Sequence, residues 1–106
     1  GISYRVAYDN QIYKTISADT VLDDSYHNCI IRVTATCTIS VPAGLRADFN
    51  CVFDAIGSII ATFAVVSGSG ITISNPFGLK LRDNAMCTLY KTSSTSYRLN
   101  GGLLPA

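Results

Sequence analysis

The 106 residues predict an all-β domain, and three features of the sequence lead to that prediction. Residues 29–41 alternate between apolar and polar side chains, except at Ile30, which is the period-two pattern of a strand with one buried face. Similar short runs follow with turn residues between them. All seven acidic residues are Asp, a residue that favours turns over helices. Together these features predict an antiparallel β-sandwich of jelly-roll-like topology.

The first half of the chain is expected to contain strands separated by polar turns. The predicted strand segments are residues 4–8, 12–16 and 29–41, the last being either two strands or one strand bent near Ala35. The polar segment 20–27 between them is expected to form a helical turn or an irregular loop. Pro42, Ala43 and Gly44 then end the strand region, because Pro cannot donate to a ladder and Gly permits a turn.

The second half of the chain is also expected to contain short strands separated by turns. The predicted strands are residues 49–55, 59–66, 71–73, 79–82, 86–91 and 97–99. Residues 59–66 are apolar on both faces, which suits a central strand or one that faces another subunit. The length predicts one domain, in which residues 1–18 form an N-terminal strand and linker segment and residues 19–106 form the β-sandwich.

The composition limits the classes of partner. Charged residues make up 14% of the chain, against about 25% in an ordinary domain. This shortage indicates either a surface rich in Ser and Thr or a surface buried against identical copies, and we favour the second. The net charge of +1 gives no basic field for nucleic acid. No apolar run approaches the ~20 residues of a membrane span, so neither nucleic acid nor membrane insertion is expected.

The four cysteines are interpreted as small core residues. Each occupies an inward-facing strand position: Cys29, Cys37, Cys51 and Cys87. Their spacing contains no Cys-x-x-Cys pair and no zinc pattern. All four are therefore expected to be reduced, which is typical of a protein made in a reducing cytoplasm.

The sequence offers no convincing catalytic cluster. His27 is the only histidine, and its neighbours Asp23 and Asp24 are more simply explained as a polar loop than as a triad or a calcium site, since EF-hand spacing is absent. Ser67 to Gly70 lacks the Lys and the following helix of a phosphate loop. We therefore predict that the chain is not an enzyme and that it uses no cofactor and no metal.

The tyrosines are the best candidates for contact with a partner. Tyrosine combines a flat apolar ring with a polar tip, which suits sugar stacking or protein contact. The candidate recognition or interface residues are Tyr4, Tyr8, Tyr13, Tyr26 and Arg98. A subunit interface or a partly buried sandwich edge is favoured over recognition, and Arg98 with Lys80 and Arg82 is also explained by a solvated face.

From about Thr15 to Gly101 several motifs follow one another in a fixed order. They are VPAGL at 41–45, DFNCVF at 48–53, TFAVVSG at 62–68 with Ile71 after it, GLKLR at 78–82, TLYK at 88–91 and YRLNG at 97–101. This order resembles a domain common in tailed-phage virion proteins, especially the tips of tail fibres and head fibres. Two positions depart from the pattern: Tyr97 stands where Trp is frequent, and Asp48 stands where Gly is usual.

The resemblance implies a homotrimer of β-sandwich subunits in a virion that is assembled in the host cytoplasm. The expected role is a structural module of a fibre or spike tip, in contact with other virion proteins and with a host-surface glycan as the candidate receptor. The alternative is a capsid decoration or cement protein on the head. A glycan-degrading spike enzyme is less favoured, because such enzymes need paired carboxylates in a groove and the Asp residues here are mostly scattered in turns.

Overall fold

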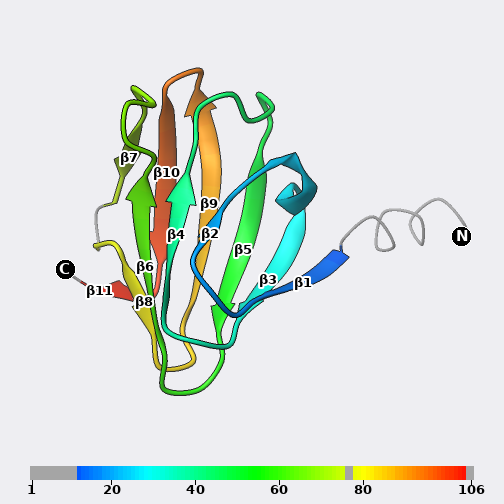
Figure 1. Ribbon diagram of the computed structural model, residues 1–106, viewed down its shortest axis with the longest axis vertical. Helices are drawn as coiled ribbons and strands as arrows, with labels where there is room; N and C mark the ends of the chain where they lie inside the picture. Colours follow the sequence, from blue (N-terminus) through cyan, green and yellow to red (C-terminus); the bar gives the residue numbers. More distant parts are fainter. Residues whose placement is uncertain (1–11, 76–77, 105–106) are drawn as a thin grey trace, which may run out of the picture.

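The computed structural model describes residues 12–75 and 78–104, which form two β-sheets around one core (Figure 1). Sheet A has the strand order β1 (Ile12–Ile16), β3 (Cys29–Val33), β5 (Asn50–Ala55), β9 (Met86–Ser93), β10 (Ser96–Gly101) and β7 (Thr72–Ser74). Sheet B has the order β11 (Leu103–Leu104), β8 (Lys80–Arg82), β6 (Ile60–Val65), β4 (Cys37–Val41) and β2 (Thr20–Val21). The described residues contain no α-helix, only the 3₁₀ turn η1 (Asp24–Tyr26).

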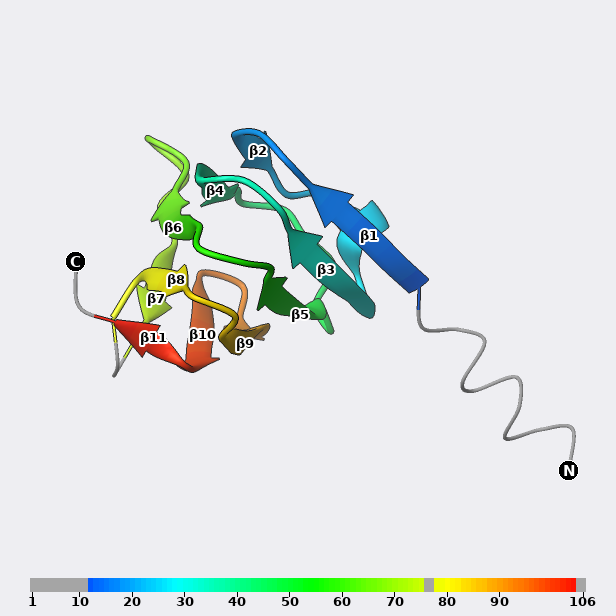
Figure 2. The same ribbon diagram turned by 90° about the horizontal axis from the view of Figure 1, so that it is seen from below.

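Residues 12–65 wind as a coil that passes alternately through the two sheets. β1, β3 and β5 lie side by side and parallel in sheet A, and β2, β4 and β6 do the same in sheet B. Each strand is followed by one in the opposite sheet, so that the chain returns to the first sheet in its original direction. Figure 2 looks along the strands and shows this winding, which is typical of a β-solenoid.

The remainder of the described chain closes the coil with antiparallel strands. In sheet A, β9 pairs antiparallel with β5 and with β10. In sheet B, β8 pairs antiparallel with β6 and with β11. The short strand β7 lies at the far edge of sheet A, parallel to β10. The all-β class is therefore confirmed, and both sheets are mixed.

The prediction of purely antiparallel sheets is wrong. Five strand pairs in the described residues are parallel, and four are antiparallel. Residues 29–41 are two strands, as one of the two interpretations held, but β3 and β4 belong to different sheets. The breaks at 17–19 and 34–36 carry the chain across to the other sheet instead of reversing it within one sheet. Period-two alternation is the same in both kinds of pairing, so it could not reveal this.

The remaining local expectations can be compared directly with the described elements. Residues 20–27, predicted as a helical turn or a loop, contain the short strand β2 and the turn η1. Residues 59–66, predicted as a central strand or one facing another subunit, form β6 between β4 and β8. The strand predicted at residues 4–8 lies outside the described residues.

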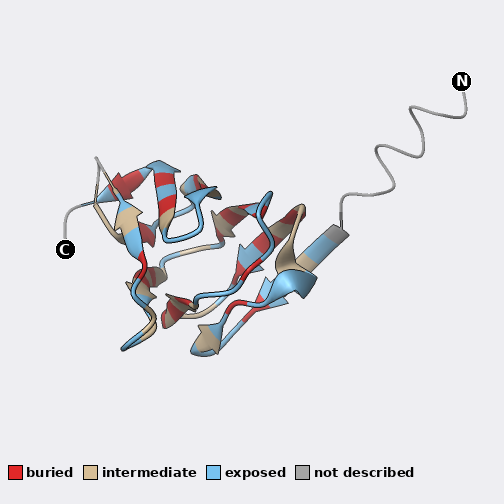
Figure 3. Cartoon of the chain, turned by 90° about the horizontal axis from the view of Figure 1, so that it is seen from above, coloured by how far each residue is buried: buried red, intermediate tan, exposed pale blue. Residues whose placement is uncertain are grey.

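Alternate residues of the central strands point into a single core (Figure 3). Phe53 on β5 and Phe63 on β6 meet edge to face with ring centroids 5.0 Å apart, and this contact joins the two sheets. All four cysteines are buried and free, as the sequence predicts. The core consists of side chains that face inward from both sheets, and their burial is the main stabilisation of the fold.

Candidate interaction surface

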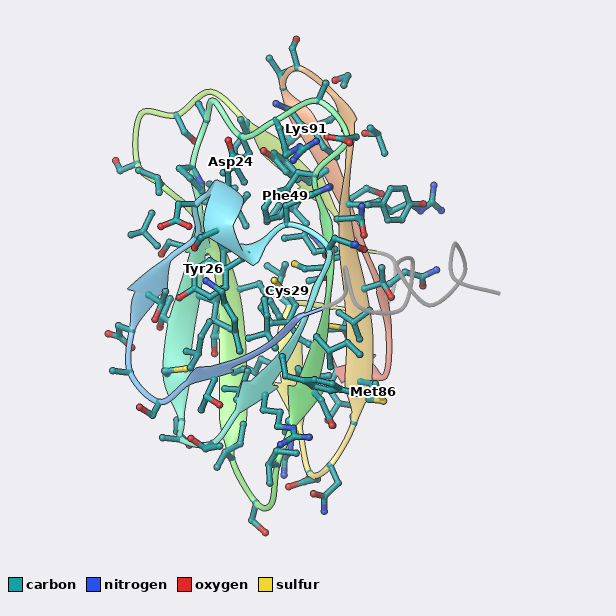
Figure 4. All side chains as sticks on the ribbon, turned by 90° about the vertical axis from the view of Figure 1, so that its right-hand side faces the viewer. Asp24, Tyr26, Cys29, Phe49, Met86 and Lys91 are labelled. Atoms are coloured by element: carbon teal, nitrogen blue, oxygen red, sulfur yellow. The ribbon has the colours of Figure 1, made fainter. Side chains whose placement is uncertain are left out.

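The outer face of sheet A is defined by the side chains that point away from the core. On β3, Cys29, Ile31 and Val33 are buried, so the intervening Ile30 and Arg32 point outward. The same alternation holds along β5, β9 and β10. In Figure 4 the side chain of Met86 projects from β9 away from the core, whereas Cys29 points into it. The outer face includes Tyr13, Thr15, Ile30, Arg32, Asn50, Val52, Asp54, Ser74, Met86, Thr88, Tyr90, Arg98 and Asn100.

Strand register places the apolar members of this face next to one another. Tyr13, Ile30 and Val52 occupy one row across β1, β3 and β5. Val52 is followed in the same row by Thr88 on β9. Tyr13 is 62% exposed, Met86 is 50% exposed and Tyr90 is 37% exposed. The face therefore leaves contiguous apolar area uncovered by the described chain.

The outer face of sheet B is organised differently. Its centre carries Thr38, Ser40, Thr62 and Ala64, which are small or polar, together with the part-buried Ile60 at the start of β6. Its two exposed large apolar residues, Val21 and Leu104, lie on β2 and β11 at opposite edges of the sheet. The outer face of sheet A, in contrast, carries exposed large apolar side chains, Met86 and Tyr90, on the central strand β9.

Charged residues on the outer face of sheet A are few, and two of them have no partner within the described chain. The ion pairs in residues 12–75 and 78–104 are His27–Asp48, Arg46–Asp48 and Arg82–Asp83. Asp54 and Arg98 are in none of them. Arg32 lies opposite Asp54 in the register, but its guanidinium lies 5.0 Å from the centre of the Tyr13 ring.

The composition of this face matches that of protein interfaces. Tyr, Met and Arg are enriched in interface cores, whereas Lys, Glu, Asp, Ser and Ala are depleted. The outer face of sheet A has two Tyr, one Met and two Arg, carries no Lys among its described members, and has one Asp, Asp54. It is therefore the candidate interaction surface.

The residues proposed from sequence fall in three places. Tyr13 and Arg98 lie on the outer face of sheet A. Tyr26 is separate from it: its half-buried ring lies in η1, 4.9 Å from the ammonium of Lys14, and burial raises the pKa of its phenol. Tyr4 and Tyr8 lie outside the described residues. The structure thus brings together two of the five candidates.

Sequence reasoning missed Val52, Met86 and Tyr90 as members of this surface. Each alternates with a buried residue on its strand: Val52 with Phe53, and Met86 and Tyr90 with Cys87 and Leu89. The alternation signal was present in the sequence, but the adjacency of β5 and β9 was not. That adjacency depends on a pairing between residues more than thirty positions apart.

The polar groups around η1 are held in local contacts (Figure 4). The Asp23 carboxylate accepts hydrogen bonds from the amide and hydroxyl of Ser25, and Asp24 accepts one from the amide of Arg46 at 2.9 Å. Hydrogen bonds from Arg46 hold the pKa of Asp48 below its usual value. The carboxylates of Asp23 and Asp24 thus act in turn formation, as the polar-loop interpretation holds.

His27 and Lys91 also make structural contacts. The His27 Nδ1 atom accepts a hydrogen bond from the amide of Asn50 at 3.4 Å. The Lys91 ammonium donates to the Leu45 carbonyl at 2.6 Å, which ties the loop after β4 to β9. No group of three or more metal-binding side chains occurs within the described residues.

The cysteine thiols are poor nucleophiles. Burial raises the pKa of the Cys87 thiol to about 12, and burial also raises the pKa of Cys51. A protonated thiol is neither a nucleophile nor a metal ligand. These side chains therefore serve packing at neutral pH.

Two cavities open at the surface of the described residues. One of about 310 Å³ is lined mainly by apolar residues of β6, β7 and the segments beside them, including Phe63, Ile71 and Leu79. The other, about 390 Å³, is lined by Leu45, Ala47 and residues 91–94. Neither cavity is lined by an Asp, so neither provides the carboxylate pair of a glycosidase.

Comparison of the sequence with protein-family models finds no match, and comparison with curated proteins finds none. Among the described residues, no helix has the length and apolar character needed to span a bilayer.

Proposed function

We propose that this chain is a non-enzymatic structural module of a tailed-phage particle, and that it assembles with copies of itself through the outer face of sheet A. The observation that supports this most directly is the apolar area around the part-buried Ile30 and Val52, with the exposed Met86 and Tyr90 on the neighbouring strand β9. An exposed apolar area of this kind is stabilised by burial against a partner. A sheet face also offers the flat, regular surface that close packing of subunits needs.

The motif order supports a fibre or spike tip as the location and three as the number of subunits. Domains with this order of motifs typically form homotrimers in which each subunit is a β-sandwich. Two sheets enclosing one core are compatible with such a subunit, although the strands here wind in parallel for much of the chain. The low charge of the sequence, 14%, supports burial of part of its surface in an assembly.

The absence of a catalytic role is supported by what the polar side chains do. Within the described residues, Asp23, Asp24 and Asp48 are engaged near η1, and His27 accepts a backbone hydrogen bond. The cysteine thiols are buried. Release of oligosaccharides from host glycans by the purified protein would contradict this part of the proposal.

The first test is the mass of the protein in solution. Sedimentation equilibrium at micromolar concentration should give three times the chain mass of 11.3 kDa. A stable monomer would contradict assembly, and a stable dimer would contradict the trimer. Electron cryomicroscopy of the virion then locates the assembly: density on a tail or head fibre supports the proposal, whereas density on the capsid lattice supports the decoration protein.

A host-surface glycan is the receptor class that fits the exposed tyrosines. Tyr13 lies on the edge strand β1, at the rim of the outer face, where its ring can stack on a sugar outside the subunit contact. A glycan array probed with the wild-type protein and with Tyr13→Ala tests this. Loss of binding without loss of the oligomer supports the receptor proposal, and equal binding by both proteins contradicts it.

A further inference from the structure

We propose that the assembly is held in register by an ion pair between Asp54 of one copy and Arg98 of the neighbouring copy. This inference rests on the proposed assembly through the outer face of sheet A. It adds a named contact and an orientation to that assembly. Two observations support it: the register of three adjacent strands, and the absence of a partner for either charge in the described residues.

The two charges lie at opposite ends of a diagonal across β9. Asp54 on β5 is opposite Met86, two residues before Thr88. Arg98 on β10 is opposite Tyr90, two residues after Thr88. With strands about 4.8 Å apart and a rise of about 3.4 Å per residue, the two backbone positions are roughly 16 Å apart. They are therefore too far apart to pair within one subunit.

A rotation axis lying along the face converts this diagonal into a pair of contacts. The axis crosses the diagonal at right angles, at its midpoint next to Thr88. Rotation of one subunit about this axis then places its Arg98 over Asp54 of the next subunit. The same operation brings Tyr90 of one copy close to Val52 of the other, so an apolar contact forms beside the ion pair. In a three-subunit ring each Asp54 takes the Arg98 of the following subunit.

Charge complementarity selects this arrangement over others. Covering the face without pairing Asp54 and Arg98 would leave two charges desolvated and uncompensated, which is unfavourable for each ion. Arg32 is the nearest alternative partner for Asp54, yet its guanidinium is placed over Tyr13. Pairs of this kind contribute more to orientation and specificity than to raw affinity. The occupant they favour is therefore a copy of the same chain.

Charge reversal tests the pair. The variants are Asp54→Lys, Arg98→Glu and the double variant carrying both, compared by sedimentation at low salt. Each single variant should weaken association by roughly tenfold or more, because two like charges then meet in the contact. The double variant should recover to within roughly threefold of wild type, since the pair is rebuilt with its charges exchanged. Lys80→Glu, on the outer face of sheet B, is the matched control and should leave association unchanged.

The failures of the two proposals are distinguishable. A wild-type protein that stays monomeric overturns the assembly and the pair together. A wild-type oligomer that tolerates both single reversals, or a double variant that does not recover, overturns the pair and leaves the assembly standing. Circular dichroism of each variant checks that these substitutions, which all point away from the core, leave the fold intact.

An equimolar mixture of the two single variants distinguishes a two-fold dimer from a three-fold ring. In a two-fold dimer, one Asp54→Lys subunit and one Arg98→Glu subunit satisfy both contacts, so an equimolar mixture should assemble. In a three-fold ring, any combination of the two variants retains at least one contact between like charges. A mixture that remains dissociated while the double variant assembles supports a paired trimer, and a mixture that forms a dimer supports the pair but contradicts the trimer.

Discussion

The inner and outer faces of sheet A share one alternating sequence but have different surroundings. On β5, the side chains of Cys51 and Phe53 are at most 1% exposed, whereas their neighbours Val52 and Asp54 are only partly buried. The inner face is filled by sheet B, and Phe53 meets Phe63 there. The outer face has no covering layer in the described chain. The stability of the subunit should therefore depend on the inner face, and its association on the outer face.

The largest difference in the effect of a substitution on stability is expected between two adjacent residues of β5, one on each face of the sheet. Phe53→Ala removes the edge-to-face contact with Phe63 and should lower the free energy of unfolding by about 3–5 kcal/mol. Val52→Ala, its outward neighbour, should lower it by less than about 1 kcal/mol. Urea unfolding followed by circular dichroism measures both. Equal losses would contradict the separation of the two faces.

Gly101 tests how closely β10 approaches β9. Its φ is +137°, and an added Cβ would lie 2.6 Å from the Met86 carbonyl oxygen and 2.7 Å from Cα of Cys87. Gly101→Ala should therefore destabilise the fold by about 2–4 kcal/mol, through backbone strain and crowding. Gly68→Ala is a useful control, because it has a comparable positive φ of +79° but no atom within 4 Å of the added Cβ. Thermal unfolding should show a clearly larger loss for Gly101→Ala.

Alkaline pH should weaken the inner face selectively. The folded state raises the pKa of Cys87 from 9.0 to about 12, so its contribution is complete below pH 9 and is lost as the pH rises toward 12. Over this range the free energy of unfolding should fall by about 1.4 kcal/mol per pH unit for this thiol, with a further fall from Cys51, whose pKa is also raised. Urea titrations between pH 8 and about 10.5 measure the slope. Cys87→Ala should make that slope shallower, and an unchanged slope would contradict the assignment.

Tyr97 is the inner-face position where a conservative change should be favourable. Its ring is 1% exposed, and its hydroxyl has no hydrogen-bond partner within the described residues. Tyr97→Phe keeps the ring and removes the desolvated hydroxyl, so the free energy of unfolding should rise by about 1 kcal/mol. Differential scanning calorimetry measures the shift in melting temperature. A loss of stability would indicate that the hydroxyl is satisfied in solution.

The smallest effect on the fold is expected on the outer face. Tyr90→Ala should change the free energy of unfolding by less than about 0.5 kcal/mol, because the ring is 37% exposed and faces away from the core. Association should nevertheless weaken roughly tenfold, since truncation of a central interface tyrosine commonly costs about 1.4 kcal/mol or more. Leu104→Ala, on the outer face of sheet B, is the matched control for association. If both substitutions weaken association equally, the proposal that association depends on the outer face of sheet A and not on that of sheet B is contradicted.

Much of the local structure could be read from individual residues. The alternation from Cys29 to Val41 predicted that the odd-numbered positions face inward, and Cys29, Ile31, Val33, Cys37, Ile39 and Val41 are all buried. The polar segment 20–27 predicted a helical turn or an irregular loop; it contains η1 with Asp23 as its N-cap, and also the short strand β2, which was not expected. The tyrosine and arginine criteria identified Tyr13 and Arg98 as contact candidates, and both lie on the outer face of sheet A.

The candidate surface as a whole could not be predicted in the same way. Its members come from β1, β3, β5, β9 and β10, and their adjacency depends on pairings between distant segments. The interpretation of Tyr26 as a member of the same group failed to anticipate that η1 would separate it from Tyr13. Residue type indicates what a single side chain can contact. The pairing of distant strands determines which side chains lie together on one face and can contact the same partner.

The sequence by itself determined that this protein is all-β, which side of each central strand is buried, and that its cysteines pack in the core, because alternation and residue polarity act locally. Only the tertiary structure decided that the first six described strands wind in parallel through two sheets, and that Asp54, Thr88 and Arg98 lie on one diagonal. The physical reason is that strand direction and register are set by connections and long-range backbone hydrogen bonds. A period-two pattern is compatible with either direction, so it leaves that choice to the packing of the whole chain.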